Sequence, residues 1–168
     1  VNLQAITYLK DQKVVQGYAD GSYKPESKIN RAEFLKIVME ASESFNTEAL
    51  EVAPHDGFTN CFPDVKTQWF ASYVCVAAQS KLIKGYDDGT FKPEREINFA
   101  EAAKIIVNTL GLEMTADDSG VWYKVYVKAL SDLSAIPQDV AGFNYNITRG
   151  QMAEMIWRIK TKQIYAPT

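Results

Sequence analysis

Two arginines of this chain occupy positions where a protein can bind a negatively charged ligand. Arg31 and Arg149 each follow by one residue a side chain suited to cap a helix, so both are expected in a first helical turn. A helix N-terminus with free amides and a positive dipole end favours anions. An arginine there can add a bidentate contact to a carboxylate. The pattern therefore predicts anion binding at one or both helix starts.

Catalytic and metal-binding chemistry has few candidates in the sequence. One histidine, His55, and two cysteines are too few for a zinc site rich in those ligands. The Asp-Gly loops lack the first and last carboxylates of a calcium-binding EF-hand. Adjacent pairs such as Asp87 and Asp88 do not face one another as the two carboxylates of a glycosidase must. We expect no enzyme, no metal site and no cofactor.

The composition is that of a globular chain. Its 168 residues are 46% hydrophobic and 23% charged, which favours one domain with a sizeable core. The net charge of −3 argues against a nucleic-acid binder. No apolar run approaches the roughly 18 residues of a membrane helix, so we expect no membrane insertion. The chain opens at Val1 without a methionine, which is typical of a fragment or a processed product.

The sequence repeats itself. Residues 17–37 and 85–105 are offset by 68 positions and share 13 of 21 residues. A shorter third copy includes 147–151, and the front of the first copy is missing. We therefore divide the single module 1–168 into repeat one (1–45), repeat two (60–112) and repeat three (115–160).

Each repeat is predicted as a helix, a structured loop and a second helix, which makes the fold all-α with short turns or strands in the Asp-Gly loops. The first helix of repeat two is expected over 68–80, with Gly85 as its C-cap. Capping boxes open the second helices at Asn30 with Glu33, Asn98 with Glu101, and Thr148 with Gln151. An apolar stripe follows each box: Phe34, Ile37, Val38 and Ala41; Ala102, Ile105, Ile106 and Thr109; Met152, Met155, Ile156 and Ile159. Three equivalent stripes suggest a central three-helix bundle with pseudo-threefold symmetry.

The motif order of repeat two resembles the S-layer homology repeat. The matching segments are Phe62-Pro-Asp-Val, Trp69-Phe-Ala, Asp88-Gly-Thr-Phe-Lys-Pro and Ile97-Asn-Phe-Ala-Glu. The resemblance implies a three-pronged spindle with grooves between repeats. It also implies a module on the cell surface, outside the cell, that anchors a larger bacterial protein noncovalently to the wall or S-layer. The implied partner is a secondary cell-wall polysaccharide, often carrying pyruvyl groups.

The resemblance and the chemistry of sugar binding together select the candidate ligand-binding residues. An aromatic ring can stack on a sugar, and a glycine loop lets backbone approach it. The candidates are Arg31, Arg149, Tyr18, Asp20, Gly21, Lys24, Tyr86, Asp88, Gly89, Lys92 and Trp69. Other interpretations stay open: surface ion pairs for the arginines, turn formation for the aspartates, solvent exposure for the lysines, and core packing for Trp69 and Trp122.

Two features depart from the family pattern or depend on it. Phe99 stands where repeat two should carry an arginine, and repeat three has lost its Gly-Tyr loop. These losses support an alternative function, a protein–protein or self-assembly module with Phe99 as an exposed contact. If the module lies outside the cell, we expect a disulfide between Cys61 and Cys75; two buried free thiols are the alternative.

Overall fold

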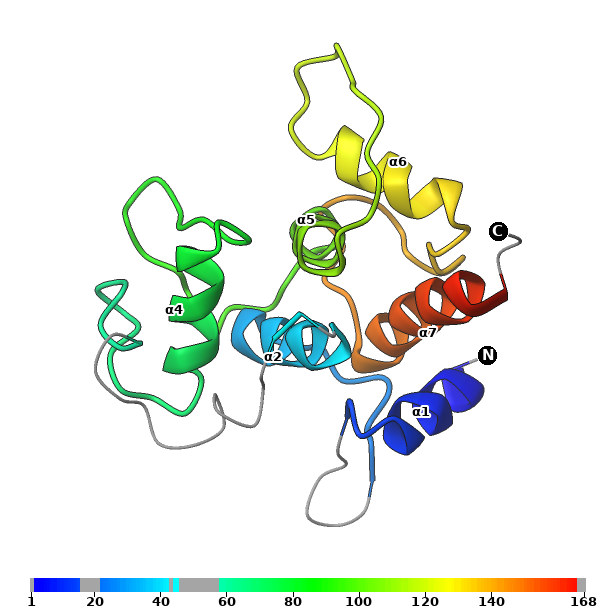
Figure 1. Ribbon diagram of the computed structural model, residues 1–168, viewed down its shortest axis with the longest axis horizontal. Coiled ribbons are helices and arrows are strands. Elements are labelled where there is room, and N and C mark those ends of the chain that lie inside the picture. The colour runs from blue at the N-terminus through cyan, green and yellow to red at the C-terminus, as the bar shows by residue number, and fades with distance from the viewer. Residues whose placement is uncertain (1, 16–21, 43, 46–57, 166–168) are drawn as a thin grey trace.

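The structure, a computed structural model, describes residues 2–15, 22–42, 44–45 and 58–165 (Figure 1). Over these residues the secondary structure is helical, with isolated bridges but no extended strand. This confirms the all-α prediction. The helices are α1 (Asn2–Asp11), α2 (Arg31–Ala41), α4 (Ala71–Gln79), α5 (Phe99–Leu110), α6 (Lys124–Asp132) and α7 (Arg149–Tyr165). No helix among these residues is both long enough and apolar enough to cross a membrane.

The helices pair between repeats rather than within them. The second helices meet at the centre, where α2 contacts both α5 and α7. On the outside, α4 of repeat two packs on α2 of repeat one, and α6 of repeat three packs on α5 of repeat two (Figure 1). The first helix, α1, packs on the last helix, α7, so the two ends of the chain lie together. The first helix of each repeat therefore packs on the second helix of a different repeat.

The loops join the repeats through the helix starts. The amide of Arg31 donates to the carbonyl of Arg95, that of Phe99 to Tyr145, and that of Arg149 to Ser27, at 2.8–2.9 Å. Isolated bridges connect the same junctions: Asn30 with Glu96, Asn98 with Asn146, and Lys28 with Thr148. Equivalent residues make all three joints, and the joints link repeat one to two, two to three, and three to one. The three-pronged outline implied by the resemblance stays a prediction.

The apolar stripes of the second helices form the centre of the core. All twelve stripe residues are buried, as their helical spacing predicts. The hydroxyl of Thr109 is buried without a hydrogen-bond partner among the described residues.

Two predicted features of repeat two's first helix are wrong. The helix begins at Ala71 rather than residue 68, and it ends at Gln79 with Ser80 as its C-cap. Gly85 is not that cap. A Cβ atom at Gly85 would lie 2.8 Å from the Phe62 ring and 2.9 Å from the Thr90 carbonyl oxygen. Glycine is needed there because the chain passes too close to its neighbours for any side chain.

A covalent bond and a carboxylate fasten the front of repeat two. Cys61 and Cys75 form a disulfide with Cα atoms 5.6 Å apart, which confirms that prediction. Asp64, between them, accepts hydrogen bonds from the amides of Phe91 (3.0 Å) and Lys92 (2.8 Å). The segment before α4 is thus attached both to the helix and to the Asp-Gly loop.

Candidate functional site

The N-terminal amides of α2 are all engaged inside the protein. Those of Arg31 and Ala32 donate to carbonyls of repeat two. That of Glu33 donates to the Asn30 side chain at 2.8 Å, and that of Phe34 to the Asn30 carbonyl. The first four amides of α7 are used in the same way, by two carbonyls of repeat one and by Thr148. The expectation of free amides for an anion is therefore wrong, and only side chains can supply positive charge.

Each capping residue is followed three positions later by a Glu or a Gln, and the contacts of that Glu or Gln differ between the helices. In α5 and α7 the exchange is reciprocal: Glu101 accepts from the Asn98 amide, and Gln151 from the Thr148 amide. Glu33 of α2 instead lies 3.4 Å from the guanidinium of Arg149. A carboxylate at this position thus reaches the arginine of another repeat.

Arg31 is held by repeat two. It is 5% exposed, its Nε donates to the Phe91 carbonyl at 3.0 Å, and its Nη1 lies 2.6 Å from the Glu101 carboxylate. The guanidinium lies over the rings of Tyr86 and Phe91, 4.8 and 4.6 Å from their centroids. The interpretation of Arg31 as a surface charge is wrong, because Arg31 is buried and forms an ion pair with Glu101 of the neighbouring repeat.

A cavity of about 170 Å³ opens beside this arginine, between parts of all three repeats. We call it groove two. Its polar and aromatic lining comes from Arg31 of repeat one, from Lys84, Tyr86, Glu101 and Lys104 of repeat two, and from Trp122 of repeat three. Gly85 also lines it. Groove two thus unites an arginine, an aromatic loop and a glycine, as the site hypothesis requires.

The Tyr86 hydroxyl and the Arg31 guanidinium share the Glu101 carboxylate. Tyr86 donates to Glu101 at 2.5 Å. Burial, together with this hydrogen bond, raises the pKa of Tyr86 to about 12. The phenol is neutral at physiological pH and can present its ring to a ligand.

Among the described residues, Lys104 is one of three cations that line groove two, with Arg31 and Lys84. Its ammonium lies 5.8 Å from the Trp122 ring centroid. Burial lowers its pKa, and the nearby charge of Lys84 lowers it further. The sequence reasoning missed Lys104 and Trp122. The repeat alignment held the signal for the tryptophan, since Trp122 matches Trp69.

A second cavity, groove one, has equivalent residues. It encloses about 460 Å³ and is lined by Arg149, Glu33, Lys36, Glu40, Glu94 and Trp69. Arg149 mirrors Arg31: its Nε donates to the Tyr23 carbonyl at 3.0 Å, and its guanidinium stacks on the Tyr23 ring. Tyr18, Asp20 and Gly21, the loop candidates of this side, lie outside the described residues.

The two groove tryptophans are surface residues. Trp69 is 53% exposed and Trp122 is 54% exposed. Each lies near the lysine of its groove, Lys36 at 5.6 Å and Lys104 at 5.8 Å. The core-packing interpretation is wrong for both, because they precede their helices and face outward.

The remaining loop candidates mostly shape the loop. The Asp88 carboxylate accepts from the Thr90 amide and hydroxyl, and these bonds lower its pKa. Gly89 takes a φ of 83°, which only glycine adopts without strain. Lys92 lies over the Tyr86 ring at 4.6 Å, and both Lys92 and Lys24 have left-handed φ values near 57°. Asp88 thus acts as a turn residue, whereas Lys92 borders the Tyr86 ring.

The equivalent junction of repeats two and three lacks the same charges. Phe99 replaces the arginine and is only 3% exposed, so the proposal of an exposed contact at Phe99 is wrong. Gln151 and Glu154 stand at the positions of Glu101 and Lys104. Glu154 is buried and pairs with Arg158 at 3.0 Å. This junction therefore offers an anion no cation at either equivalent position.

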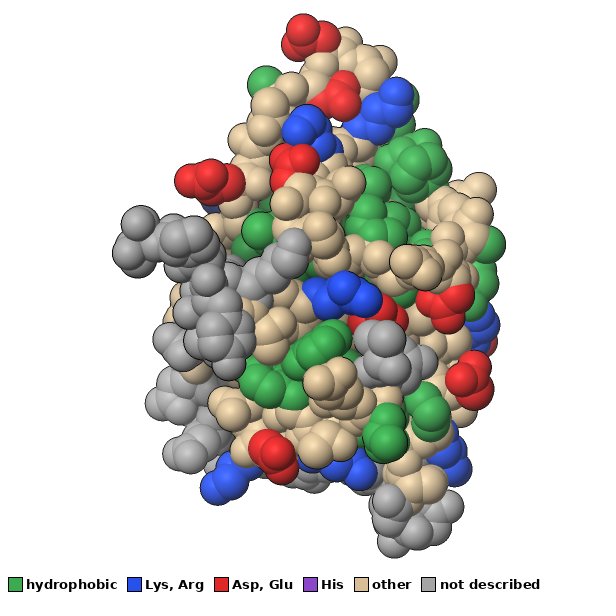
Figure 2. Space-filling view, turned by 90° about the vertical axis from the view of Figure 1, so that its right-hand side faces the viewer, with side chains coloured by type: hydrophobic (Ala, Val, Ile, Leu, Met, Phe, Trp, Pro, Cys, Tyr) green, Lys and Arg blue, Asp and Glu red, His purple; other side chains and the backbone are tan. Residues whose placement is uncertain are grey.

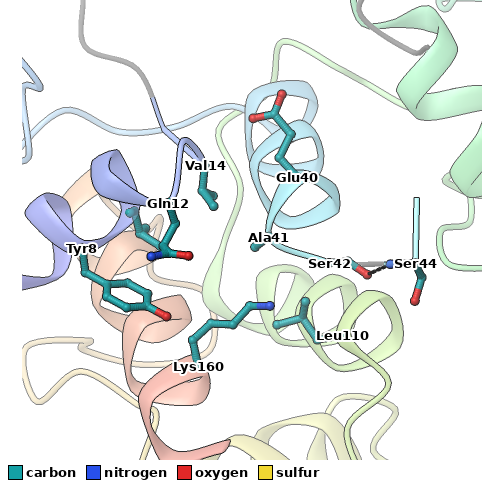
Figure 3. Close-up of a pocket in the computed structure, with 10 residues that line it drawn as sticks. Tyr8, Gln12, Val14, Glu40, Ala41, Ser42, Ser44, Leu110 and Lys160 are labelled. Carbon is teal, nitrogen blue, oxygen red and sulfur yellow. Dashed lines mark hydrogen bonds between the residues drawn. The ribbon is translucent and has the colours of Figure 1, made fainter. Parts of the chain in front are cut away.

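A further cavity of about 530 Å³ lies among α1, α2, α5 and α7 and holds none of the predicted ligand residues. Figure 3 shows Tyr8 of α1 and Gln12 just after it on one side and Glu40 and Ala41 of α2 on the other, with Lys160 extending toward Leu110. The face in Figure 2 carries acidic and basic side chains interspersed, rather than a field of one sign.

Comparison with known proteins identifies two of the repeats. A profile of the S-layer homology domain matches residues 3–35 and 62–103. These segments contain α1 except its first residue, the start of α2, and repeat two from Phe62 into α5. Repeat three stays a prediction from the internal alignment.

Three relatives from bacterial surfaces are similar to the chain. The middle cell wall protein of Brevibacillus brevis is 36% identical over 145 residues, 85% of this chain and 13% of the relative. The surface layer protein of Brevibacillus choshinensis is 34% identical over 72% of this chain and 10% of its own length. The cellulosome-anchoring protein of Acetivibrio thermocellus is 29% identical over 63% of this chain and 23% of its own. The chain spans less than a quarter of each.

Proposed function

Because the chain belongs to the S-layer homology family through residues 3–35 and 62–103, we propose that it anchors a bacterial surface protein noncovalently to the cell wall. The family is one of cell-surface modules rather than enzymes, and its similarity to surface-layer proteins places the chain at the cell surface. A relative named for anchoring, the cellulosome-anchoring protein, supports the proposed role. The larger protein that the module carries is part of the same proposal.

Groove two supports a secondary cell-wall polysaccharide as the ligand. It places an exposed indole, a phenol ring and cationic side chains around one cavity. Aromatic rings can stack on sugar rings, and a cation in a partly desolvated site attracts a carboxylate more strongly than one in bulk water. A sugar carrying a pyruvyl group combines both features. We propose a pyruvylated sugar of the wall polysaccharide as the occupant.

The test is binding of the intact chain to purified cell-wall polysaccharide, before and after removal of its pyruvyl groups by mild acid. Wild type should bind the pyruvylated form, and Trp122→Ala should weaken binding by about tenfold or more through loss of the stacking surface. Met114→Ala is the matched control, since Met114 is 49% exposed and lines neither groove. Absence of wild-type binding to either form would overturn the proposal. Equal binding of both forms would remove only the anionic part.

A further inference from the structure

The buried arginines of the two grooves are already neutralised. Arg31 is paired with Glu101 at 2.6 Å, and Arg149 lies 3.4 Å from Glu33. Since the helix amides are also engaged, neither helix start offers a free positive group. An anionic ligand must therefore be attracted by another cation.

The lysine beside each tryptophan differs between the grooves. Lys36 in groove one has Glu40 four residues later, with the two charged groups 3.8 Å apart. Lys104 in groove two has Asn108 at the equivalent position, and it makes no ion pair with any residue that the structure describes. A neutral amide in place of a carboxylate leaves the charge of Lys104 available.

The charges lining the two cavities differ in the same sense. Of the described residues, three cations and one carboxylate line groove two, namely Arg31, Lys84, Lys104 and Glu101. Groove one is lined by two cations and three carboxylates, namely Lys36, Arg149, Glu33, Glu40 and Glu94. Like charges on Lys84 and Lys104 repel, and an anion between them would relieve that repulsion. Among the described residues, the lining of groove two is therefore net positive and that of groove one net negative.

We infer that groove two is the anion-selective groove of this module and that Lys104, rather than Arg31, contacts the ligand carboxylate. Arg31 acts as a positioning residue: its bonds to Phe91 and Glu101 hold the neighbouring repeats and the Tyr86 ring in place. This inference rests on the proposed function, because it assigns the charge recognition within that same site. It predicts that the charge of Lys104 does not contribute to binding of the same polysaccharide after its pyruvyl groups are removed.

The test compares Lys104→Gln with the matched variant Lys36→Gln, which removes the same charge from groove one. The intact chain is titrated with pyruvylated polysaccharide and with the same polysaccharide after pyruvate removal. Loss of one charge-assisted hydrogen bond should weaken binding of the pyruvylated form at least tenfold in Lys104→Gln. Binding of the pyruvate-free form should stay unchanged. Lys104→Arg, which keeps the positive charge, should retain most of the wild-type affinity for the pyruvylated form. Lys36→Gln should bind the pyruvylated and the pyruvate-free polysaccharide like wild type.

Thermal unfolding of each variant separates recognition from folding. Lys104 is a half-buried side chain that makes no ion pair with the described residues, so Lys104→Gln should melt within a few degrees of wild type. If wild type binds the pyruvylated polysaccharide and Lys104→Gln binds it equally well, the inference is overturned but the proposed function is not. The same holds if Lys36→Gln loses as much affinity as Lys104→Gln. No wild-type binding to either polysaccharide would overturn the proposed function and this inference together.

Discussion

At the scale of single residues, the partners of each charged group in groove two separate structural charges from available ones. Arg31, Glu101 and the Tyr86 hydroxyl satisfy one another inside the joint between repeats. Lys104 shares the cavity but not this network. Arg31 was a candidate because of its residue type alone. Its contacts show that it holds the parts of the site in position and that its charge is already paired.

The burial of Tyr86, together with its hydrogen bond to Glu101, predicts a pH dependence of stability. Its pKa is about 12 in the folded chain and near 10 when unfolded, so the fold favours the protonated phenol. This stabilisation is complete below about pH 10 and is lost as the pH rises toward 12. Urea unfolding of wild type and Tyr86→Phe should show a difference in the free energy of unfolding that shrinks over this range. A difference that stays constant from pH 9 to 12 would contradict the raised pKa of Tyr86.

At the scale of the elements, repeat two is shaped by contacts made before its first helix. The segment from Cys61 to Asp64 is bonded to α4 by a disulfide and to the Asp-Gly loop by two amides. The Phe62 ring then lies 5.6 Å from that of Phe91 and covers Gly85. These contacts place the Tyr86 loop against the start of α2.

The crowding at Gly85 predicts a costly methyl group. Gly85→Ala should destabilise the chain by about 1–3 kcal/mol, because the new Cβ would meet a ring and a backbone carbonyl. Gly142→Ala is the matched control, since nothing lies within 4 Å of a Cβ there. Chemical denaturation measures both. A Gly85→Ala variant as stable as the control would mean that the loop can shift away.

The disulfide predicts a reductant-sensitive stability. It closes a loop with a sequence separation of 14, and the chain-entropy estimate for such a loop is about 3 kcal/mol. Reduction should lower the melting temperature, while a Cys61→Ser, Cys75→Ala double variant should melt lower with or without reductant. If reductant lowers the melting temperature of the double variant as much as that of wild type, the effect does not arise from this bond.

At the scale of the whole molecule, the repeats form a closed arrangement rather than an open array. Each first helix packs on the second helix of another repeat, and α1 packs on α7 (Figure 1). A linear array can lose its terminal repeat alone, because each repeat contacts only its neighbours along the chain. Here the first repeat and the last are neighbours as well.

This closure predicts one cooperative unfolding transition. Leu9 is fully buried on α1, and Leu9→Ala should cost about 2–5 kcal/mol to the entire module rather than to repeat one. Melting followed by helical circular dichroism and by tryptophan fluorescence should coincide in both proteins. Two separated transitions, with only the first shifted in Leu9→Ala, would contradict closure.

Much of the fold could be predicted from the chain because its determinants are local. Helical spacing of apolar residues and Asn or Thr before each second helix depend on neighbours within one or two turns. The two cysteines lie on adjacent segments of the chain, so their pairing could also be predicted from the sequence. The duplication added the equivalence of the second helices, which placed twelve core residues correctly.

The candidate site was predicted only in part, because pairing between repeats depends on residues far apart in sequence. The sequence by itself determined the helical repeats, their caps and the arginines at the helix starts. Only the tertiary structure decided that those starts are closed by carbonyls 60 or more residues away, and that Phe99 points into the core. It also brought Lys104 to Trp122 of the next repeat. Such contacts are set by how the helices pack around one another, and no local spacing encodes them.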